Sequence, residues 1–205
     1  MGVITVLDST PSIQQLGLQP YDVIYEKMQA FQAQRDADTP DEIWLLEHEP
    51  VFTLGRNGKR EHILTPTQIP VIQIDRGGQV TYHGPGQLIV YTLIDLKRNR
   101  IGVKQWVNHL ENCVIQLLAD FGISAASDRN APGVYVSGKK IAALGLRVSK
   151  GRCYHGLSLN VDMDLQPFQN INPCGHAGLE VTQCRDLGVK TSLDAISHIF
   201  AKSLY

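Results

Sequence analysis

RGGQVTYHGPGQLIVYTLIDL, residues 76–96, joins a glycine-rich run to a nearly unbroken apolar run. Its second half, 88–96, has the length of a strand, and continuous apolar sequence is typical of a strand buried on both faces. Its first half carries glycine at 77, 78, 84 and 86, and glycine lets the backbone adopt positive φ and approach a ligand closely. This half therefore fits either a hairpin with two tight turns or the wall of a groove for an extended or acyl ligand.

Around this stretch, helical and strand patterns follow each other irregularly. Apolar residues at helical spacing predict helices over 20–35, 103–121 and 192–204. Short apolar runs predict strands over 42–48, 51–55, 70–75, 133–136, 139–149 and 153–162, while 163–184 has the composition of a loop. Strands alone and in pairs between a few helices favour an α+β domain with a mixed sheet over a doubly wound fold. No repeat or linker interrupts the chain, so we expect a single domain over residues 1–205.

The composition is that of an ordinary globular protein. The 205 residues are 43% hydrophobic and 19% charged, and a chain of this length can bury a core without disulfides or metals. The net charge of −1 gives no global basic field, so nucleic acid is not an expected partner. No apolar run approaches the ~20 residues that span a bilayer, and the first ten residues lack a signal-peptide pattern. We therefore expect a cytoplasmic protein without a membrane partner, whose four cysteines are thiols.

Neither common nucleotide-binding loop is present. The dinucleotide fingerprint G-x-G-x-x-G between a strand and a helix does not fit 76–91. The segment GKKIA, 138–142, lacks the hydroxyl residue that follows the lysine in a phosphate-binding loop, and it lies in a predicted strand. The glycine-rich run is therefore not a recognisable nucleotide cradle.

The fixed positions of 76–91 resemble a known signature. Arg76-Gly77-Gly78-x-x-Thr81-Tyr82-His83-x-x-Gly86-Gln87-x-Ile89-x-Tyr91 is similar to the signature of the bacterial octanoyltransferases of lipoate biosynthesis, the LipB family. Three further blocks agree with it, namely GKKIAALGLRVS (138–149), HGLSLNVD (155–162) and NPCG (172–175). The resemblance spans residues 42–182 and implies the mixed α+β catalytic fold that biotin and lipoate protein ligases share.

The resemblance also implies a reaction. An octanoyl group would move from octanoyl-acyl carrier protein to a specific lysine of a lipoyl domain through a cysteine thioester. The acceptors would be the lipoyl domains of 2-oxoacid dehydrogenase E2 subunits and the glycine cleavage H protein. Passing from a thioester to an amide is downhill, so no ATP, cofactor or metal is expected. The implied substrate-binding residues are Arg76, Gly77, Gly78, Gln79, Val80, Thr81, Tyr82, His83, Ala143, Leu144, Gly145, Gly156, Leu157 and Ser158.

Cys174 lies in the segment NINPCGHAG, whose residues favour neither helix nor strand. Taken alone, it could be a chance loop thiol. The resemblance implies instead that Cys174 is the catalytic nucleophile that accepts the acyl group. Because a free thiol is only a few per cent thiolate near neutral pH, a neighbouring positive charge is expected to stabilise the anion.

Lys139 and Lys140 are the candidates for this charge. Consecutive side chains of a strand point to opposite faces, so at most one of the two reaches a given site. Alternation does not say which one, and two consecutive lysines could also mark a solvated turn. The resemblance selects Lys140, which directly precedes the Ile141-Ala142 pair, as the catalytic partner that exchanges protons during transfer.

Two other arrangements stay open at the level of the sequence. His83 could act as the base of a Cys–His pair, although the resemblance places it in the acyl-binding wall. A zinc ion could be held by Cys153, His155, Cys174 and His176, with Cys184 nearby, although the usual C-x-x-C spacing is missing.

Two other functions compete with octanoyl transfer. An ATP-dependent lipoate ligase on the same fold would need no cysteine nucleophile, and a non-catalytic module would only hold acylated carrier or lipoyl domains. Acidic protein partners could be received by basic stretches, which could equally be ordinary solvated surface. These stretches are Arg56/Lys59/Arg60, Lys97/Arg98/Arg100 and Arg147/Lys150/Arg152.

Overall fold

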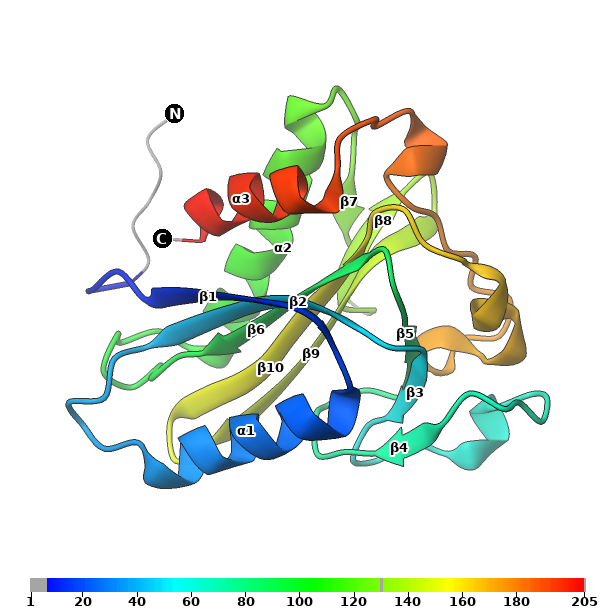
Figure 1. Ribbon diagram of the computed structural model, residues 1–205. Helices are drawn as coiled ribbons and strands as arrows, with labels where there is room; N and C mark the ends of the chain where they lie inside the picture. The colour runs from blue at the N-terminus through cyan, green and yellow to red at the C-terminus, as the bar shows by residue number, and fades with distance from the viewer. Residues whose placement is uncertain (1–6, 130, 205) are drawn as a thin grey trace.

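A seven-stranded mixed sheet forms the centre of the molecule and carries helices on both faces (Figure 1). The computed structural model describes residues 7–129 and 131–204. The strands of this sheet lie in the order β1 (Ser12–Gln19), β2 (Glu42–His48), β6 (Gln87–Leu93), β10 (Arg152–Asn160), β9 (Lys139–Ser149), β8 (Gly133–Val136) and β7 (Ala126–Ser127). β1 and β2 are parallel, and the other neighbouring pairs are antiparallel. The mixed α+β sheet that the sequence predicts is thus confirmed.

A smaller sheet extends from the middle of the large one. In it, β3 (Val51–Leu54) pairs in parallel with β4 (Val71–Gln73) and antiparallel with β5 (Val80–His83). Short turns lead from β2 into β3 and from β5 into β6. Because β2 and β6 are neighbours, the small sheet is held beside the centre of the large sheet.

β6 accounts for the apolar run of 88–96. Leu88 and Val90 face a core cluster under α2 (Val103–Asp120) and α3 (Leu193–Ser203). Ile89 and Tyr91 face the opposite cluster under α1 (Tyr21–Gln34). Every residue of β6 is buried, because helices cover both faces of the sheet (Figure 1), and the strand therefore needs no polar alternation.

The three predicted helices are confirmed, and in two of them an apolar residue lies outside the buried side. In α1, Ile24 and Met28 are fully buried, whereas Val23 is 40% exposed and lies outside the packed stripe. In α3, Phe200 faces the core, but Ile199 is 40% exposed. Each exposed residue directly precedes a buried one, and the helical step carries it away from the core contact.

The sequence pattern misses three strands. β1 is largely polar and is interrupted by Gly17 at φ 65, where its register against β2 shifts. β7 is only two residues long. β5 lies inside the glycine-rich stretch, between Gly78 and Gly86, which both have φ 84. A Cβ at Gly86 would lie 1.9 Å from the carbonyl oxygen of Asp162, so this turn requires glycine.

Residues 163–184 form loops and short turns, as their composition predicts. They include the 3₁₀ turns η2 (Gln166–Asn170) and η3 (Pro173–Gly175), and η4 (Arg185–Leu187) follows them. A backbone bridge ties this region to β9, because the Lys140 N–H donates to Glu180 and the Thr182 N–H donates to Lys140, both at 2.9 Å. The bridge holds the segment that follows η3 against the start of β9.

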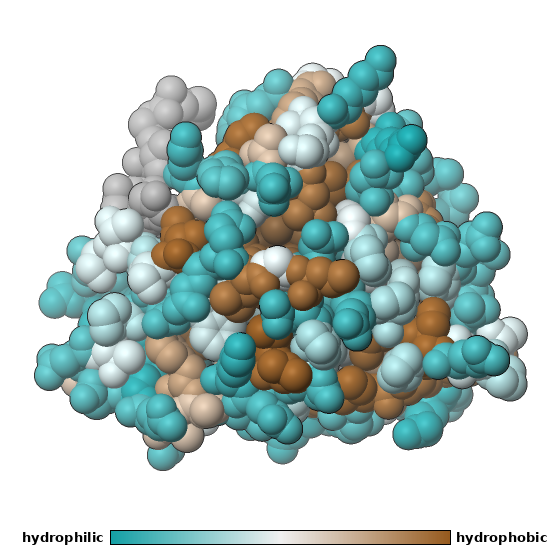
Figure 2. Space-filling model, viewed as in Figure 1, coloured by the Kyte–Doolittle hydropathy of each residue, from teal (hydrophilic) through white to brown (hydrophobic). Residues whose placement is uncertain are grey.

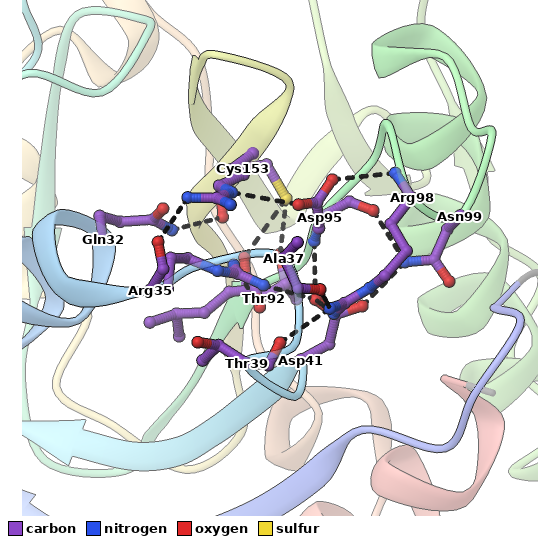
Figure 3. Close-up of polar contacts among 12 residues, drawn as sticks. Gln32, Arg35, Ala37, Thr39, Asp41, Thr92, Asp95, Arg98, Asn99 and Cys153 are labelled. Atoms are coloured by element: carbon purple, nitrogen blue, oxygen red, sulfur yellow. Dashed lines mark hydrogen bonds and ion pairs between the residues drawn. The ribbon is translucent and has the colours of Figure 1, made fainter.

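A buried ion network joins the ends of α1, β2, β6 and β10 (Figure 3). The Asp41 carboxylate accepts hydrogen bonds from the Arg35 guanidinium and from the Asp95 backbone N–H, each at 2.7 Å. Arg98 pairs with the same carboxylate at 2.7 Å, and Arg152 pairs with Asp95 at 3.1 Å. The side chains of Arg35 and Asp41 are completely buried. Such charges are tolerated in the interior because each has a partner.

Polar residues cover most of the face seen in Figure 2, with apolar residues grouped between them. Within the described ranges, no helix combines the length and apolar character needed to cross a bilayer. The opening segment, for which the sequence predicts no targeting signal, falls mainly on residues 1–6 and lies outside the described residues.

Candidate active site

A narrow pocket, with a cavity volume of about 50 Å³ and open to solvent, lies between β5, β9, β10 and η3. Of the predicted substrate-binding residues, all except Gly77 and Tyr82 line it, and Cys174 lines it as well. The lining residues are Tyr21, Arg76, Gly78, Gln79, Val80, Thr81, His83, Ile89, Tyr91, Ala143, Leu144, Gly145, His155, Gly156, Leu157, Ser158 and Cys174. Three segments that are distant in the sequence are thus brought to one cavity.

Gly77 and Tyr82 lie outside the pocket lining, in contrast to the prediction. Tyr82 packs in an aromatic cluster with Phe52 on the other side of β5, because neighbours in a strand point to opposite faces. Gly77 supports the wall through its backbone only. Its N–H donates to the Leu146 carbonyl at 3.0 Å, and its own carbonyl accepts from the Arg76 guanidinium at 2.8 Å.

A glycine pair across two strands shapes one wall of the pocket. Gly145 of β9 is opposite Gly156 of β10. A Cβ at Gly156 would lie 1.9 Å from the Val90 carbonyl oxygen, and one at Gly145 would lie 2.9 Å from Cδ of Arg76. Because Gly156 has no side chain, β10 can approach β6 closely. Because Gly145 has none, the Arg76 side chain can lie across β9.

Lys140 and Cys174 are brought together at one end of this pocket. The Nζ atom of Lys140 donates a hydrogen bond to Sγ of Cys174 at 3.0 Å. Lys140 is only 3% exposed, whereas Lys139 is exposed and pairs with Glu180 at 3.2 Å. Because consecutive side chains of a strand point to opposite faces, the two lysines lie in different environments. Lys140 is the lysine that contacts the Cys174 sulfur.

The backbone presents the Cys174 thiol in an uncommon conformation. Cys174 has φ 56, in the left-handed region that non-glycine residues rarely adopt. It is half-buried, while its neighbour Gly175 takes φ 80 and packs close to Gln79 and His62. Residues held in such conformations cluster at functional sites. The backbone conformation of η3 therefore points to Cys174 as a functional residue, independently of the chemistry of its thiol.

The surroundings of Lys140 favour its charged form. Burial opposes that form, but the electrostatic interaction with Cys174, the hydrogen bond to its sulfur and the effect of Tyr135 outweigh burial, so the pKa of Lys140 is raised. Nζ also donates to the Pro132 carbonyl at 3.2 Å and lies 5.2 Å from the centre of the Tyr135 ring. A Lys140 ammonium beside Cys174 is the kind of partner that keeps a thiolate charged.

His83 is a neutral imidazole with both ring nitrogens engaged. Nδ1 donates to Oε1 of Gln87 at 2.7 Å, and Nε2 accepts from the Thr53 hydroxyl at 3.2 Å. The Thr53 hydroxyl in turn accepts from Arg76 at 2.8 Å. Burial lowers the pKa of His83 to about 3, with smaller effects from His48 and Arg76. This arrangement fits a wall residue and leaves neither nitrogen available as the base of Cys174.

Tyr21, which the sequence pattern misses, completes the pocket lining, and His48, also missed, packs against it. Tyr21, at the start of α1, lies 4.8 Å from the ring of His48, at the end of β2. His48 accepts from the Tyr91 hydroxyl at 2.7 Å, and burial lowers the pKa of His48 to about 4. Tyr21 and His48 lie far in the sequence from the glycine-rich stretch. Tyr21 lines the pocket from α1, whereas the pairing of β2 with β6 brings His48 next to Tyr91, behind the lining.

Arg76 contributes a buried positive charge to the pocket. Its guanidinium donates to the Thr53 carbonyl at 2.8 Å, and no carboxylate of the described residues lies within 4.0 Å of it. Burial lowers the pKa of Arg76, and Tyr21 and Cys174 oppose that shift. Because an arginine stays charged in proteins, the pocket holds a permanent cation near the sulfur.

The other three thiols lie in the core. Burial raises the pKa of Cys113 and of Cys153 to about 11 and that of Cys184 to about 12. Cys113 is 5% exposed and belongs to the core cluster under α2 and α3. Across the described part of the chain, no three His, Cys, Asp or Glu side chains converge on a point that could hold a metal ion. The alternative zinc set of Cys153, His155, Cys174 and His176 is therefore not assembled.

Comparison with known families agrees with this geometry. The family of the lipoyl protein ligase A/B catalytic domain matches residues 21–205. The octanoyltransferase of Shewanella sp. (strain ANA-3) is 58% identical over 181 residues, which are 88% of this chain and 83% of that protein. The octanoyltransferase of Thiobacillus denitrificans (strain ATCC 25259 / T1) is 55% identical over 197 residues, which are 96% and 90% of the two chains.

Solved structures of lower sequence identity share the fold. A lipoate-protein ligase A bound with ATP has a TM-score of 0.79 and 14% identity, and the match covers 95% of this chain and 84% of that one. The biotin protein ligase from Aquifex aeolicus has a TM-score of 0.57 and 12% identity, with 96% and 68% covered. The likeness shows the fold alone, and it confirms the predicted fold shared with biotin and lipoate ligases.

Proposed function

We propose that this chain, which belongs to the lipoyl protein ligase A/B catalytic family and is an octanoyltransferase of lipoate biosynthesis, transfers the octanoyl group through a thioester on Cys174. The observation that carries the proposal is the 3.0 Å contact between Lys140 Nζ and Cys174 Sγ at the end of the pocket. A thiolate beside an ammonium, at the opening of a cavity, is the arrangement of an activated sulfur nucleophile.

In the first half-reaction, the Cys174 thiolate attacks the carbonyl carbon of an incoming octanoyl thioester. A new C–S bond forms to Cys174, and the C–S bond to the donor thiol breaks. The departing thiolate takes a proton from the Lys140 ammonium, which leaves Lys140 as a neutral amine. The 3.0 Å contact of Lys140 Nζ with the attacking sulfur of Cys174 supports this role, because the departing thiolate leaves from the carbon that this sulfur attacks.

In the second half-reaction, an acceptor lysine attacks the octanoyl thioester on Cys174. The C–N bond of the amide forms, the C–S bond to Cys174 breaks, and the thiolate is restored. Lys140 then takes up the proton that the attacking amine gives off, and so regains its charge. Neither half-reaction needs activation by ATP, because the donor already carries the octanoyl group as a thioester.

The pocket fits an apolar acyl chain. Ile89, Leu144 and Leu157 give it apolar walls, while Gly145 and Gly156 leave room along the strands. Burying the chain against these side chains would contribute about 0.8 kcal/mol for each methylene removed from water. The pocket thus supplies binding energy at a distance from the reacting carbonyl.

The partners we propose are an octanoyl-acyl carrier protein as donor and lipoyl domains of E2 subunits and the glycine cleavage H protein as acceptors. The basic loop with Arg56, Lys59 and Arg60 supports this choice, because its exposed cations border the pocket segment near Gln79 and suit acidic proteins. We also propose a cytoplasmic location, which accords with four unpaired cysteines in the described residues.

The decisive experiment exposes the purified protein to octanoyl-acyl carrier protein and follows its intact mass. We expect one octanoyl adduct, labile to hydroxylamine, on the peptide that contains Cys174. Cys174→Ser should form no such labile adduct, whereas Cys113→Ser, which changes a core thiol, should still form it. A Cys174→Ala protein that modifies lipoyl domains at the normal rate from octanoate and ATP would replace the proposal with a ligase mechanism.

A further inference from the structure

Glu111 places a carboxylate on the apolar side of α2. It is only 6% exposed and lies between Leu110 and Val114, which are both fully buried. Charged side chains are almost never buried in this way unless they have a partner. The position of Glu111 therefore calls for a role that an apolar residue could not fill.

The partner of Glu111 is the backbone segment that holds Lys140. Oε1 of Glu111 accepts a hydrogen bond from the Gly133 N–H at 2.9 Å. The carbonyl oxygen of Pro132, in the same peptide unit as that N–H, accepts from Lys140 Nζ at 3.2 Å. Nζ then reaches Cys174 Sγ at 3.0 Å. A continuous series of hydrogen bonds thus runs from the helix through one peptide group to the sulfur.

Gly133 shows how closely this peptide approaches Lys140. A Cβ at Gly133 would lie 3.0 Å from Cε of Lys140 and 2.7 Å from the Ala142 carbonyl oxygen. Gly133 also has φ 146, a conformation that other residues rarely adopt. The backbone here is therefore fitted against the lysine side chain, and Glu111 anchors it from the opposite side.

We propose that Glu111 is a positioning residue, which fixes the Pro132–Gly133 peptide so that the Pro132 carbonyl holds the Lys140 ammonium against Cys174. The inference rests on the function proposed above. Glu111 does not line the acyl pocket, so it acts on the reacting sulfur only through the peptide and Lys140.

The charge of Glu111 supports the same arrangement. Burial raises the pKa of Glu111, while the Gly133 N–H and the charge of Lys140 act in the opposite direction. Lys104 and Arg129 line the same cleft as Glu111. A hydrogen bond from a backbone N–H to a carboxylate is also stronger than one between neutral groups.

The test uses Glu111→Ala, which removes the acceptor, and Glu111→Gln, whose amide oxygen can still accept from Gly133. Asp120→Asn removes an exposed carboxylate from the same helix and serves as the control. Two rates are measured on the Cys174 peptide, alkylation by iodoacetamide at pH 7 and acylation by an octanoyl thioester of a small thiol. Thermal unfolding of each variant checks that it is folded.

We expect Glu111→Ala to slow both rates by about tenfold, the size expected when one hydrogen bond to a charged group is lost. The KM for the small thioester should not change, because Glu111 does not contact the acyl pocket. Glu111→Gln should restore most of the rate, and Asp120→Asn should match the unchanged protein.

The inference is overturned if folded Glu111→Ala reacts at the unchanged rate. It is also overturned if Glu111→Gln is as slow as Glu111→Ala, since charge and not the hydrogen bond would then be responsible. Failure of the underlying function is a separate outcome, because in that case the unchanged protein itself forms no octanoyl adduct on Cys174.

Discussion

Two clusters of charged groups lie at opposite ends of the same sheet. At one end, Lys140 near the start of β9 contacts the Cys174 sulfur and a single carbonyl. At the other end, Ser149 of β9 pairs with Arg152, which belongs to the network around Asp41. The nine residue steps from Lys140 to Ser149 separate the two clusters by about 30 Å of strand.

The two clusters differ in how completely their charges are paired. The Asp41 carboxylate accepts from Arg35, Arg98 and two further donors, and its side chain has no exposed surface (Figure 3). Lys140 is buried to a similar degree, but its partner sulfur is half-exposed and faces a pocket. A buried charge therefore indicates chemistry only where its partner remains accessible to a reactant, and it indicates structure where every partner is enclosed.

The largest expected effect is at the accessible cluster. Replacing Lys140 by Ala removes the ammonium to which we assign thiolate stabilisation and proton exchange, so octanoyl transfer should fall by about 10²–10⁴-fold. Alkylation of Cys174 at pH 7 should slow as well, because less thiolate is present. Lys139→Ala, which removes the exposed neighbour, is the matched control and should leave both rates nearly unchanged. Equal alkylation rates in Lys140→Ala and the unchanged protein would contradict the role of the charge.

Lys140→Arg sharpens the comparison further. Arginine keeps a positive charge beside Cys174 but cannot release a proton in the accessible pH range. We therefore expect alkylation to be largely retained while octanoyl transfer stays low. If transfer recovered together with alkylation, charge alone would be sufficient, and Lys140 would have no role in proton exchange.

The next effect concerns stability at the enclosed cluster. Asp41→Ala leaves the buried Arg35 without its carboxylate, and breaking a buried pair in this way costs about 3–5 kcal/mol. Urea denaturation should show this loss in the free energy of unfolding, while alkylation of Cys174 in the folded variant should be unchanged. Asp162→Ala is the control, because its partner Arg185 is 68% exposed, and exposed pairs contribute about 0–1 kcal/mol. If both variants lost a similar amount of unfolding free energy, burial of the ion pair would not determine its contribution to stability.

Much of the fold follows from local sequence. The helical spacing of Leu110, Val114 and Leu117 predicts α2, and the continuous apolar run of β6 predicts a strand covered on both faces. The boundaries of β8 and β9 agree with the prediction because glycine and lysine turns delimit them. Sequence patterns do not predict β1, because its residues are largely polar and its partner strand β2 is separated from it in sequence by α1.

The site is less accessible to sequence reasoning. The Cys174–Lys140 pair rested on resemblance, because strand alternation could not choose between Lys139 and Lys140. The structure separates them by burial, since Lys140 is 3% exposed. His48 and Glu111 were missed, because their partners Tyr91 and Gly133 come from other elements and no local pattern joins them. A carboxylate inside the apolar stripe of α2 was the one signal that could have pointed to Glu111.

Lowering the pH should have a smaller effect, which also differs between the two ends of the sheet. It should reduce the free energy of unfolding through the histidines near the pocket. Burial lowers the pKa of His48 from 6.5 to about 4 and that of His83 to about 3, so both stay largely neutral in the folded protein between pH 6.5 and about 4. Unfolded histidine binds a proton there, so the unfolded state holds more protons between pH 6.5 and 4, and stability falls as pH falls. Each histidine contributes up to about 1.4 kcal/mol per pH unit in this window. The Asp95 carboxylate of the enclosed network has a lowered pKa, so it stays charged over most of the same range.

His48→Gln isolates one of these contributions. Its free energy of unfolding, measured by urea denaturation from pH 7 to 5, should fall less steeply as the pH falls. The slope of the free energy against pH should be smaller than that of the unchanged protein by the equivalent of about one bound proton. The comparison uses the slope and not the absolute stability, because the loss of the bond from the Tyr91 hydroxyl lowers stability at every pH. The unchanged protein, measured in parallel, gives the reference slope. If His48→Gln kept this slope, acid sensitivity would not originate at the pocket, and the two ends of the sheet would respond to pH alike.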